Sequence, residues 1–330
     1  MDDLPSWFDN NLFQIVAAIV AAFLVLVVIR TTTELCDACA DEELGAQNER
    51  SGGRNPDSRR DHLAEGTHYQ VAECGPRVSQ QSFDYDWVRG PHTWNAPMNN
   101  QSPINIDVRC LETNCFDTPL TWSLYDVMPL GIRLENNGHT LVLRAAFEGQ
   151  TPSIYGADLL GRFHLWEITF RWSWFSSNGS EHSIDNRHSA LEMQCLHTDA
   201  DSQHCASSQG ILVISYLFDL SEDNPFLDVL VQHLVAVQQA GQTVEIPPFP
   251  LTYLMPAFHN EFYSYHGSLT EPPCHRGAEW FIQPVTLAIS ERQLNEFRQL
   301  RDRRGGRIGK NARPVQPLED RTVYMNQYSY

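Results

Sequence analysis

The sequence predicts a mostly β domain with a few peripheral helices, preceded by one transmembrane helix near the N-terminus. Short apolar and β-branched runs alternate with Gly, Pro and Asn turn residues from residue 83 onward. Two segments with helical spacing and capping residues interrupt these runs. A long apolar run lies far upstream, at residues 12–29.

The composition is that of a globular protein and excludes one class of partner. Of the 330 residues, 42% are hydrophobic and 19% are charged, which suits a chain that buries a core. The 41 acidic side chains outnumber the 23 basic ones, so the formal net charge is -18. Nucleic-acid binding depends on Lys and Arg that neutralise phosphates, and we therefore expect no nucleic-acid partner.

The apolar run predicts a membrane anchor. Residues 12–29 contain Gln14 as their one polar residue and form about 27 Å of helix, which just spans a bilayer. A cleaved signal peptide is the alternative, but acidic residues replace its usual basic segment and no clear cleavage site follows. We expect a short tail at residues 1–11, a transmembrane helix at 12–30, and lipid contact through 12–29.

Two features disagree about the side of the membrane on which the domain lies. Arg30 is the only cation close to the apolar run, and the positive-inside rule would place the domain in the cytosol. Asn178-Gly179-Ser180 is a glycosylation sequon, and the eight cysteines would suit an oxidising compartment. We expect a single-pass membrane glycoprotein with an extracellular or lumenal domain and Asn178 as the glycosylation candidate.

Residues 31–82 predict a flexible stalk. They contain few large apolar side chains, so folding could not offset the loss of chain entropy. Cys36 and Cys39 form a CxxC pair, which beside an anchor indicates lipidation or an inter-chain disulfide more often than a metal site.

The domain at residues 83–330 contains five strand-like runs and two helical segments. The runs are residues 132–147, 163–174, 190–197, 210–220 and 279–289. One helical segment begins at the capping residue Asn224 and extends to residue 240, and the other covers residues 290–300 with Ser290 as its cap. About 250 residues are compatible with one sheet-centred core.

Five short motifs occur in order in this domain. They are QSPINI at 101–106, NNGH at 136–139, GSEH at 179–182, GSLTEPP at 267–273 and RPVQPL at 313–318. With this set, the chain from about Tyr85 onward resembles the alpha-type carbonic anhydrase family. The resemblance implies a central, mainly antiparallel ten-stranded sheet with three zinc-binding histidines, two on one strand as His-x-His and one on its neighbour.

The family's spacing has a physical reason. Residues i and i+2 of a strand share one face, so His-x-His and a histidine across the ladder leave a fourth tetrahedral position for water. Zinc lowers the pKa of that water to about 7 and supplies hydroxide for the attack on carbon dioxide.

All three ligand positions differ in this sequence. Trp172 and the GSEH motif frame the first strand and Glu192 marks the second, so Thr169, Arg171 and Gln194 stand at the histidine positions. A hydroxyl and a neutral amide are weak zinc ligands, and a guanidinium places positive charge where the metal would be. His164 and His197 lie at odd separations from these positions, on the opposite strand face. We expect no zinc and no other cofactor.

The resemblance also implies roles for the residues around the altered positions. Glu181 and Thr270 match the pair that orients the zinc-bound hydroxide, and His139 matches the proton shuttle. Three residues match the cavity wall: Val213, Leu269 and Trp280. Such residues tune a metal site but cannot replace it, so we expect none of them to be catalytic.

A buried arginine needs a partner, because an unpaired charge in an apolar cleft is costly. We expect Glu181 to hold Arg171. The alternative is that Arg171 captures a small anion or a carboxylate of a partner.

The cysteines leave the disulfide pattern open. The resemblance implies a partner for Cys274 just before the QSPI motif, where this chain has no cysteine. The remaining options are free thiols or the pairs Cys74–Cys274, Cys110–Cys115 and Cys195–Cys205.

These features predict a membrane-anchored, catalytically silent carbonic anhydrase relative that binds an unknown protein or ligand. One alternative is an active zinc carbonate dehydratase with an atypical ligand set, which converts carbon dioxide and water to bicarbonate and a proton. A purely structural surface protein is another.

Overall fold

The computed structural model of the chain describes residues 83–199 and 210–328. The predicted tail, transmembrane helix and stalk at residues 1–82 lie outside this part. Within it, none of the helices has the length and apolar character needed to cross a membrane.

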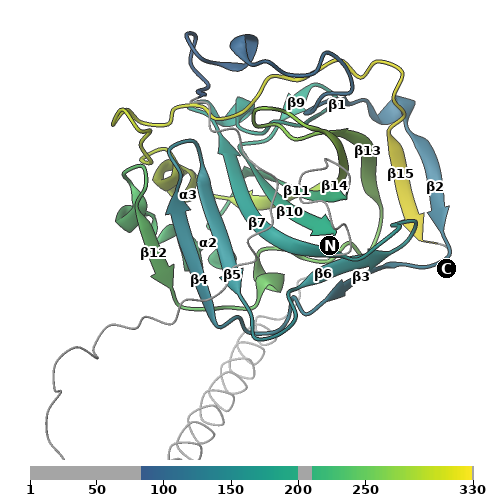
Figure 1. Cartoon of the computed structure of the whole chain (residues 1–330), viewed down its shortest axis with the longest axis horizontal. Helices are drawn as coiled ribbons and strands as arrows, with labels where there is room; N and C mark the ends of the chain where they lie inside the picture. The colour runs from purple at the N-terminus through teal and green to yellow at the C-terminus, as the bar shows by residue number, and fades with distance from the viewer. Residues whose placement is uncertain (1–82, 200–209, 329–330) are drawn as a thin grey trace, which may run out of the picture. The chain divides into compact units, whose positions relative to one another are not determined.

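A mixed sheet of twelve strands forms the centre of the domain (Figure 1). The strands are β2 (Glu112–Phe116), β3 (Leu120–Ser123), β4 (Gly131–Asn136), β5 (Leu141–Ala146), β6 (Ser153–Gly156), β7 (Phe163–Trp172), β10 (Leu191–Asp199), β11 (Ile211–Leu220), β12 (Thr243–Ile246), β13 (Phe262–Ser268), β14 (Arg276–Ile289) and β15 (Tyr324–Tyr328). Ten of them follow the order β12-β4-β5-β7-β10-β11-β14-β13-β15-β2, while β6 pairs with β3 and β7. A small separate sheet contains β1 (Asn105–Ile106), β8 (Ser183–Ile184) and β9 (Arg187–His188).

The expected number of ten strands was wrong, because the sheet contains twelve. Most neighbouring strands are antiparallel, as expected. The sheet is mixed, because β11 runs parallel to β14 and β15 runs parallel to β2. Tight turns produce antiparallel neighbours, whereas long connections allow parallel ones. Both parallel pairs join strands that are distant in the sequence, so no local turn dictates their direction.

The predicted strand-like runs form strands. Residues 132–147 form the β4–β5 hairpin, and the other four runs correspond to β7, β10, β11 and β14. Along β11, Leu212, Ile214 and Tyr216 face the larger hydrophobic core, whereas Ile211 and Val213 face a smaller one. This alternation follows from the two-residue period of a strand.

Both predicted helices form, with the expected caps. The Asn224 side chain accepts a hydrogen bond from the backbone of α2 (Pro225–Val231), and Ser290 forms a capping box with Gln293 of α3 (Glu291–Phe297). The first helix is shorter than expected, because α2 ends at Val231 and a 3₁₀ turn follows at Leu234–Val237. That turn buries Leu234 and Val237, which its three-residue period places on one side.

Candidate functional site

A cavity of about 50 Å³ lies over β7, β10, β11 and β14. Its lining residues come from these strands and from the loop after β13: Glu167, Thr169, Arg171, Gln194, Leu196, Val213, Leu269, Thr270, Glu271, Pro272, Pro273 and Trp280. Strand alternation places the β7 and β10 residues on one face. The structure therefore brings together the three altered ligand positions, Thr270 and the three wall residues predicted from the sequence.

The register of β7 and β10 sets the geometry of the altered positions. Gln194 lies directly across the ladder from Thr169, and Glu192 lies across from Arg171. Thr169 is 8% exposed, Arg171 3% and Gln194 4%, so the chain has buried a positive charge beside two neutral polar groups.

Arg171 has two acidic partners. Its Nη2 donates a 2.9 Å hydrogen bond to Oε1 of Glu271, and its Nε lies 3.5 Å from Oε1 of Glu181. The expected partner, Glu181, thus lies within ion-pair distance, but the shorter contact is with Glu271. Sequence reasoning missed Glu271, although it directly follows Thr270 in the GSLTEPP motif.

These carboxylates keep Arg171 charged. Burial by itself lowers the pKa of the guanidinium, but the charges of Glu271 and Glu181 outweigh this effect and raise the pKa above its ordinary value. Arg171 therefore holds a permanent positive charge beside the cavity.

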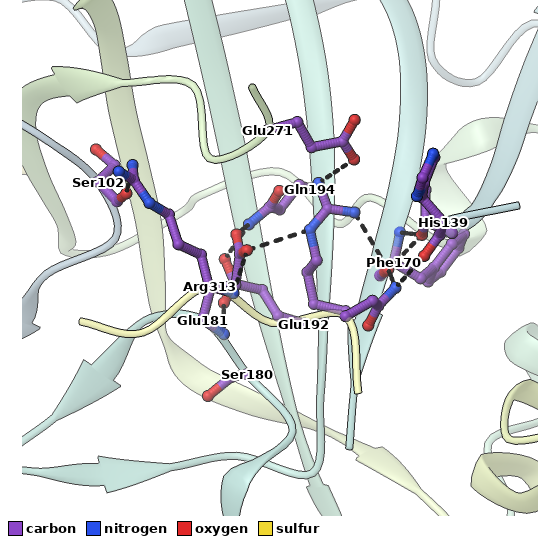
Figure 2. Close-up of polar contacts among 12 residues, drawn as sticks. Ser102, His139, Phe170, Ser180, Glu181, Glu192, Gln194, Glu271 and Arg313 are labelled. Atoms are coloured by element: carbon purple, nitrogen blue, oxygen red, sulfur yellow. Dashed lines mark hydrogen bonds and ion pairs between the residues drawn. The ribbon is translucent and has the colours of Figure 1, made fainter. Parts of the chain in front are cut away.

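Gln194 is held by two acidic side chains (Figure 2). Its Nε2 donates to Oε2 of Glu181 at 2.7 Å and to Oε1 of Glu192 at 2.9 Å. Glu181 also accepts the backbone N–H of Arg313 at 2.9 Å. In the described part of the chain no hydrogen bond joins Glu181 to Thr270, the residue with which it pairs in the family.

Glu192 is the centre of a buried hydrogen-bond network. It accepts bonds from the backbone N–H groups of Glu181 and His182 and from the side chains of His182, Gln194 and Ser215. Burial raises the pKa of Glu192, but the His182 imidazole and the hydrogen bonds outweigh it and lower this pKa to about 2. Glu192 is therefore a carboxylate at neutral pH.

The network joins four of the five sequence motifs. His182 of GSEH contacts the hydroxyl of Tyr265 at 2.8 Å, and that hydroxyl donates to Ser102 of QSPINI at 2.7 Å. Ser102 also accepts the backbone N–H of Ser268 in GSLTEPP, and Arg313 of RPVQPL donates to the Ser102 carbonyl at 2.7 Å. These motifs thus support the sheet around the cavity.

His139 lies outside the lining of the cavity. Its imidazole stacks on Phe83 with ring centroids 4.0 Å apart and planes 11° from parallel. Burial is the largest influence on this imidazole and lowers its pKa. The residue at the family's proton-shuttle position is therefore packed against an aromatic ring.

The residues at the site do not fit a zinc ion. Arg171 is a cation, and Gln194, whose Nε2 is bonded to Glu181 and Glu192, offers only a neutral amide oxygen, which is a weak zinc ligand. His164 and His197 are not among the lining residues, and His197 bonds to Cys195 and Tyr125 instead. In residues 83–199 and 210–328, no cluster of three or more His, Cys, Asp or Glu side chains is arranged to hold a metal.

Four cysteines lie within the described ranges, and no disulfide joins any two of them: Cys110, Cys115, Cys195 and Cys274. The considered Cys110–Cys115 disulfide is therefore not formed in this structure. Cys74 and Cys205 lie outside the described ranges, so their considered pairs with Cys274 and Cys195 stay predictions. Burial raises the pKa of Cys274 to about 11, which makes this thiol unreactive.

Comparison with known proteins agrees with the sheet and the motifs. A family model described as eukaryotic-type carbonic anhydrase matches residues 87–327. The chain belongs to this family. It is 29% identical to carbonic anhydrase 12 of Homo sapiens over 75% of this chain and 73% of that protein. It is 26% identical to carbonic anhydrase 1 of Monodelphis domestica over 74% of this chain and 98% of that protein.

Proposed function

We propose that this protein is a membrane-anchored member of the carbonic anhydrase family that does not hydrate carbon dioxide and acts as a binding domain. One observation carries the proposal: the family's metal position holds Arg171, whose charge is compensated by Glu271 and Glu181. A guanidinium has only donor groups, stays protonated and supplies no nucleophile. Three of the side chains around it, Glu181, Glu192 and Gln194, are hydrogen-bonded to one another.

The size and charge of the cavity indicate what it does not bind. A volume of about 50 Å³ accommodates a few water molecules, so a protein segment would not enter it. Glu167 and Glu271 line the cavity beside Arg171, which disfavours the alternative that Arg171 captures an anion. We assign the binding role to the outer surface of the domain, where a protein partner would contact it.

We further propose that the domain lies outside the cytosol, behind the anchor at residues 12–30. Asn178 of the sequon is exposed, at the end of a 3₁₀ turn, where a glycan can extend into solvent. The sequon supports this side of the membrane against the single arginine that follows the apolar run.

Metal content and hydratase activity test the catalytic part of the proposal. The full chain, purified in detergent, would be analysed for zinc by mass spectrometry and for carbon dioxide hydration by stopped flow. We expect no stoichiometric zinc and no rate above that of buffer. Stoichiometric zinc with measurable hydration would instead establish the alternative, a carbonate dehydratase with an atypical ligand set.

A further inference from the structure

Phe175 and Asn178 are the two ends of a short turn that follows β7. The 3₁₀ turn Ser176–Asn178 is closed by a 3.0 Å hydrogen bond from the backbone N–H of Asn178 to the carbonyl of Phe175. The Cα atoms at the ends of such a turn lie less than about 7 Å apart. Phe175 and Asn178, both exposed, are therefore neighbouring residues on the surface.

The Phe175 ring is unusually exposed for a large apolar side chain. It is 74% exposed, and the preceding Trp174 is 48% exposed. Within the described part of the chain, no aromatic ring or guanidinium stacks on Phe175. An exposed aromatic face of this kind is a candidate contact surface.

The turn is held in place by α3. The Ser176 hydroxyl accepts a 3.0 Å hydrogen bond from Arg298 and donates a 3.3 Å bond to Glu291. A Cβ atom at Gly179 would lie only 1.8 Å from the carbonyl oxygen of Ala190, so the backbone packs closely where the turn ends. The Phe175 ring and Asn178 are thus presented on an ordered backbone, which reduces the entropy lost when they bind a ligand.

The hydroxyl of the sequon is not accessible in the folded domain. Ser180 is 1% exposed, donates to the carbonyl of His182 at 2.6 Å and accepts the N–H of Ser189 at 2.9 Å. A glycan on Asn178 would therefore have to be transferred before this segment folds. The turn would then form with the sugar already attached.

We propose that the exposed face of Phe175 is the binding platform for the first N-acetylglucosamine of a glycan on Asn178. The proposal rests on the extracytosolic location proposed above. The face of an aromatic ring carries partial negative charge and attracts the C–H groups on one face of a pyranose. The sugar covers an apolar side chain and stabilises the turn in return.

An alternative binding site for the sugar lies beside the turn. An open hollow of about 590 Å³ is lined by polar side chains that include Ser177, Asn186, Arg187 and Asp219. A glycan seated there would bond to these groups and would not depend on the Phe175 ring.

A glycan-removal experiment on the full chain distinguishes binding on the Phe175 ring from binding in the polar hollow. The protein would be made in secretory cells, its glycan mapped by mass spectrometry, and its unfolding temperature measured before and after enzymatic trimming to one N-acetylglucosamine and after complete removal. We expect the trimmed and untrimmed forms to unfold at the same temperature. Complete removal should lower that temperature by about 2 to 4 °C.

The same removal in variants isolates the aromatic contact. In Phe175→Ala and Phe175→Leu, complete glycan removal should lower the unfolding temperature by less than about 1 °C. In Phe175→Tyr it should lower this temperature as much as in the parent. Leu160→Ala is the matched control, because Leu160 is a fully exposed apolar residue just before the start of β7, at the end of the strand away from the turn. This variant should behave like the parent.

Three results would overturn the proposal. If glycan removal lowered the unfolding temperature of Phe175→Ala as much as that of the parent, the sugar would bind in the polar hollow. If it did so in Phe175→Leu, the sugar would only cover an apolar side chain and would need no aromatic ring. If Asn178 carried no glycan, the proposed ligand would be absent and the proposed extracytosolic location would be contradicted. The zinc and hydration measurements do not depend on the glycan and would still test the catalytic part of the proposed function.

Discussion

Arg171 donates a 2.9 Å hydrogen bond to Glu271, although 100 positions separate the two residues in the sequence. The first lies on β7, and the second lies in the loop between β13 and β14. Together with Glu181, this contact compensates a positive charge that is only 3% exposed. The charge balance of the cavity therefore depends on Glu271, which is not at a metal-ligand position of the family and does not lie on a strand next to β7.

Replacement of Glu271 should expose the cost of this buried charge. In Glu271→Gln the guanidinium keeps one charged partner, Glu181 at 3.5 Å, so we expect the free energy of unfolding to fall by about 1 to 3 kcal/mol. Urea unfolding followed by tryptophan fluorescence measures this. Asp223→Asn, which removes a partner of the exposed Arg292, is the control and should leave stability nearly unchanged. A Glu271→Gln protein as stable as the parent would contradict the assigned pairing.

Replacement of Glu181 should cost more than replacement of Glu271. Glu181 is fully buried and also accepts hydrogen bonds from Gln194 and Arg313. In Glu181→Gln a new amide donor would face the donors of Arg171 or Gln194, and we expect a loss of about 2 to 4 kcal/mol. Arg171→Met in the Glu181→Gln background should recover part of it, because the unpaired charge is gone. Strictly additive effects in this double-mutant cycle would show that the two residues do not interact.

Restored histidines should restore a metal site. We expect the triple variant Thr169→His, Arg171→His, Gln194→His to bind zinc stoichiometrically and to unfold at a higher temperature with zinc than without it, since the ligand binds only the folded state. The parent and a triple alanine variant at the same positions should show neither effect. A folded histidine variant that binds no zinc would mean that the surrounding cavity no longer has the geometry for a metal.

His197 should make the fold sensitive to mild acid. Its Nδ1 donates to the Cys195 carbonyl at 2.9 Å, its Nε2 accepts from Tyr125 at 2.6 Å, and burial lowers its pKa to about 3. The unfolded chain protonates this histidine near pH 6.5, so stability falls between about pH 6.5 and pH 3, by up to about 1.4 kcal/mol per pH unit.

His197→Gln should remove this contribution and flatten the dependence of the unfolding free energy on pH. Chemical unfolding of parent and variant at a series of pH values within this window measures the difference. Parallel curves would show that the folded protein binds the proton at His197 as readily as the unfolded chain does.

Much of the fold was predictable because its signals are local. The alternating runs that became β4, β5, β7, β10, β11 and β14 depend on a two-residue period, and the caps Asn224 and Ser290 bond to backbone groups two or three residues away. The same period explains why Thr169 and Arg171 share the cavity face. The parallel pairing of β11 with β14 has no such local signal, because a long connection permits either direction.

The candidate site likewise has some features that the sequence predicts and others that it does not. The face on which His197 lies was readable along β10, and the clustering of Thr169, Arg171 and Gln194 was readable once the family register was recognised. The prediction that His164 lies on the face opposite Thr169 was wrong, because a β-bulge between Leu165 and Glu167 interrupts the two-residue period of β7. The stacking of Phe83 on His139 was not readable, because it joins distant segments of the chain. The hydrogen bonds of Ser102 with Tyr265, Ser268 and Arg313 likewise became visible only in three dimensions.

By itself, the amino-acid sequence determined which chemical groups stand at the three ligand positions of the family, and therefore that a hydroxyl, a guanidinium and an amide replace three imidazoles. Only the tertiary structure decided how the resulting charge is balanced, with Glu271 as the nearer partner and Glu181 shared with Gln194 and Arg313. The reason is physical: residue identity is a local property, whereas compensation of a buried charge depends on distances that the whole fold sets.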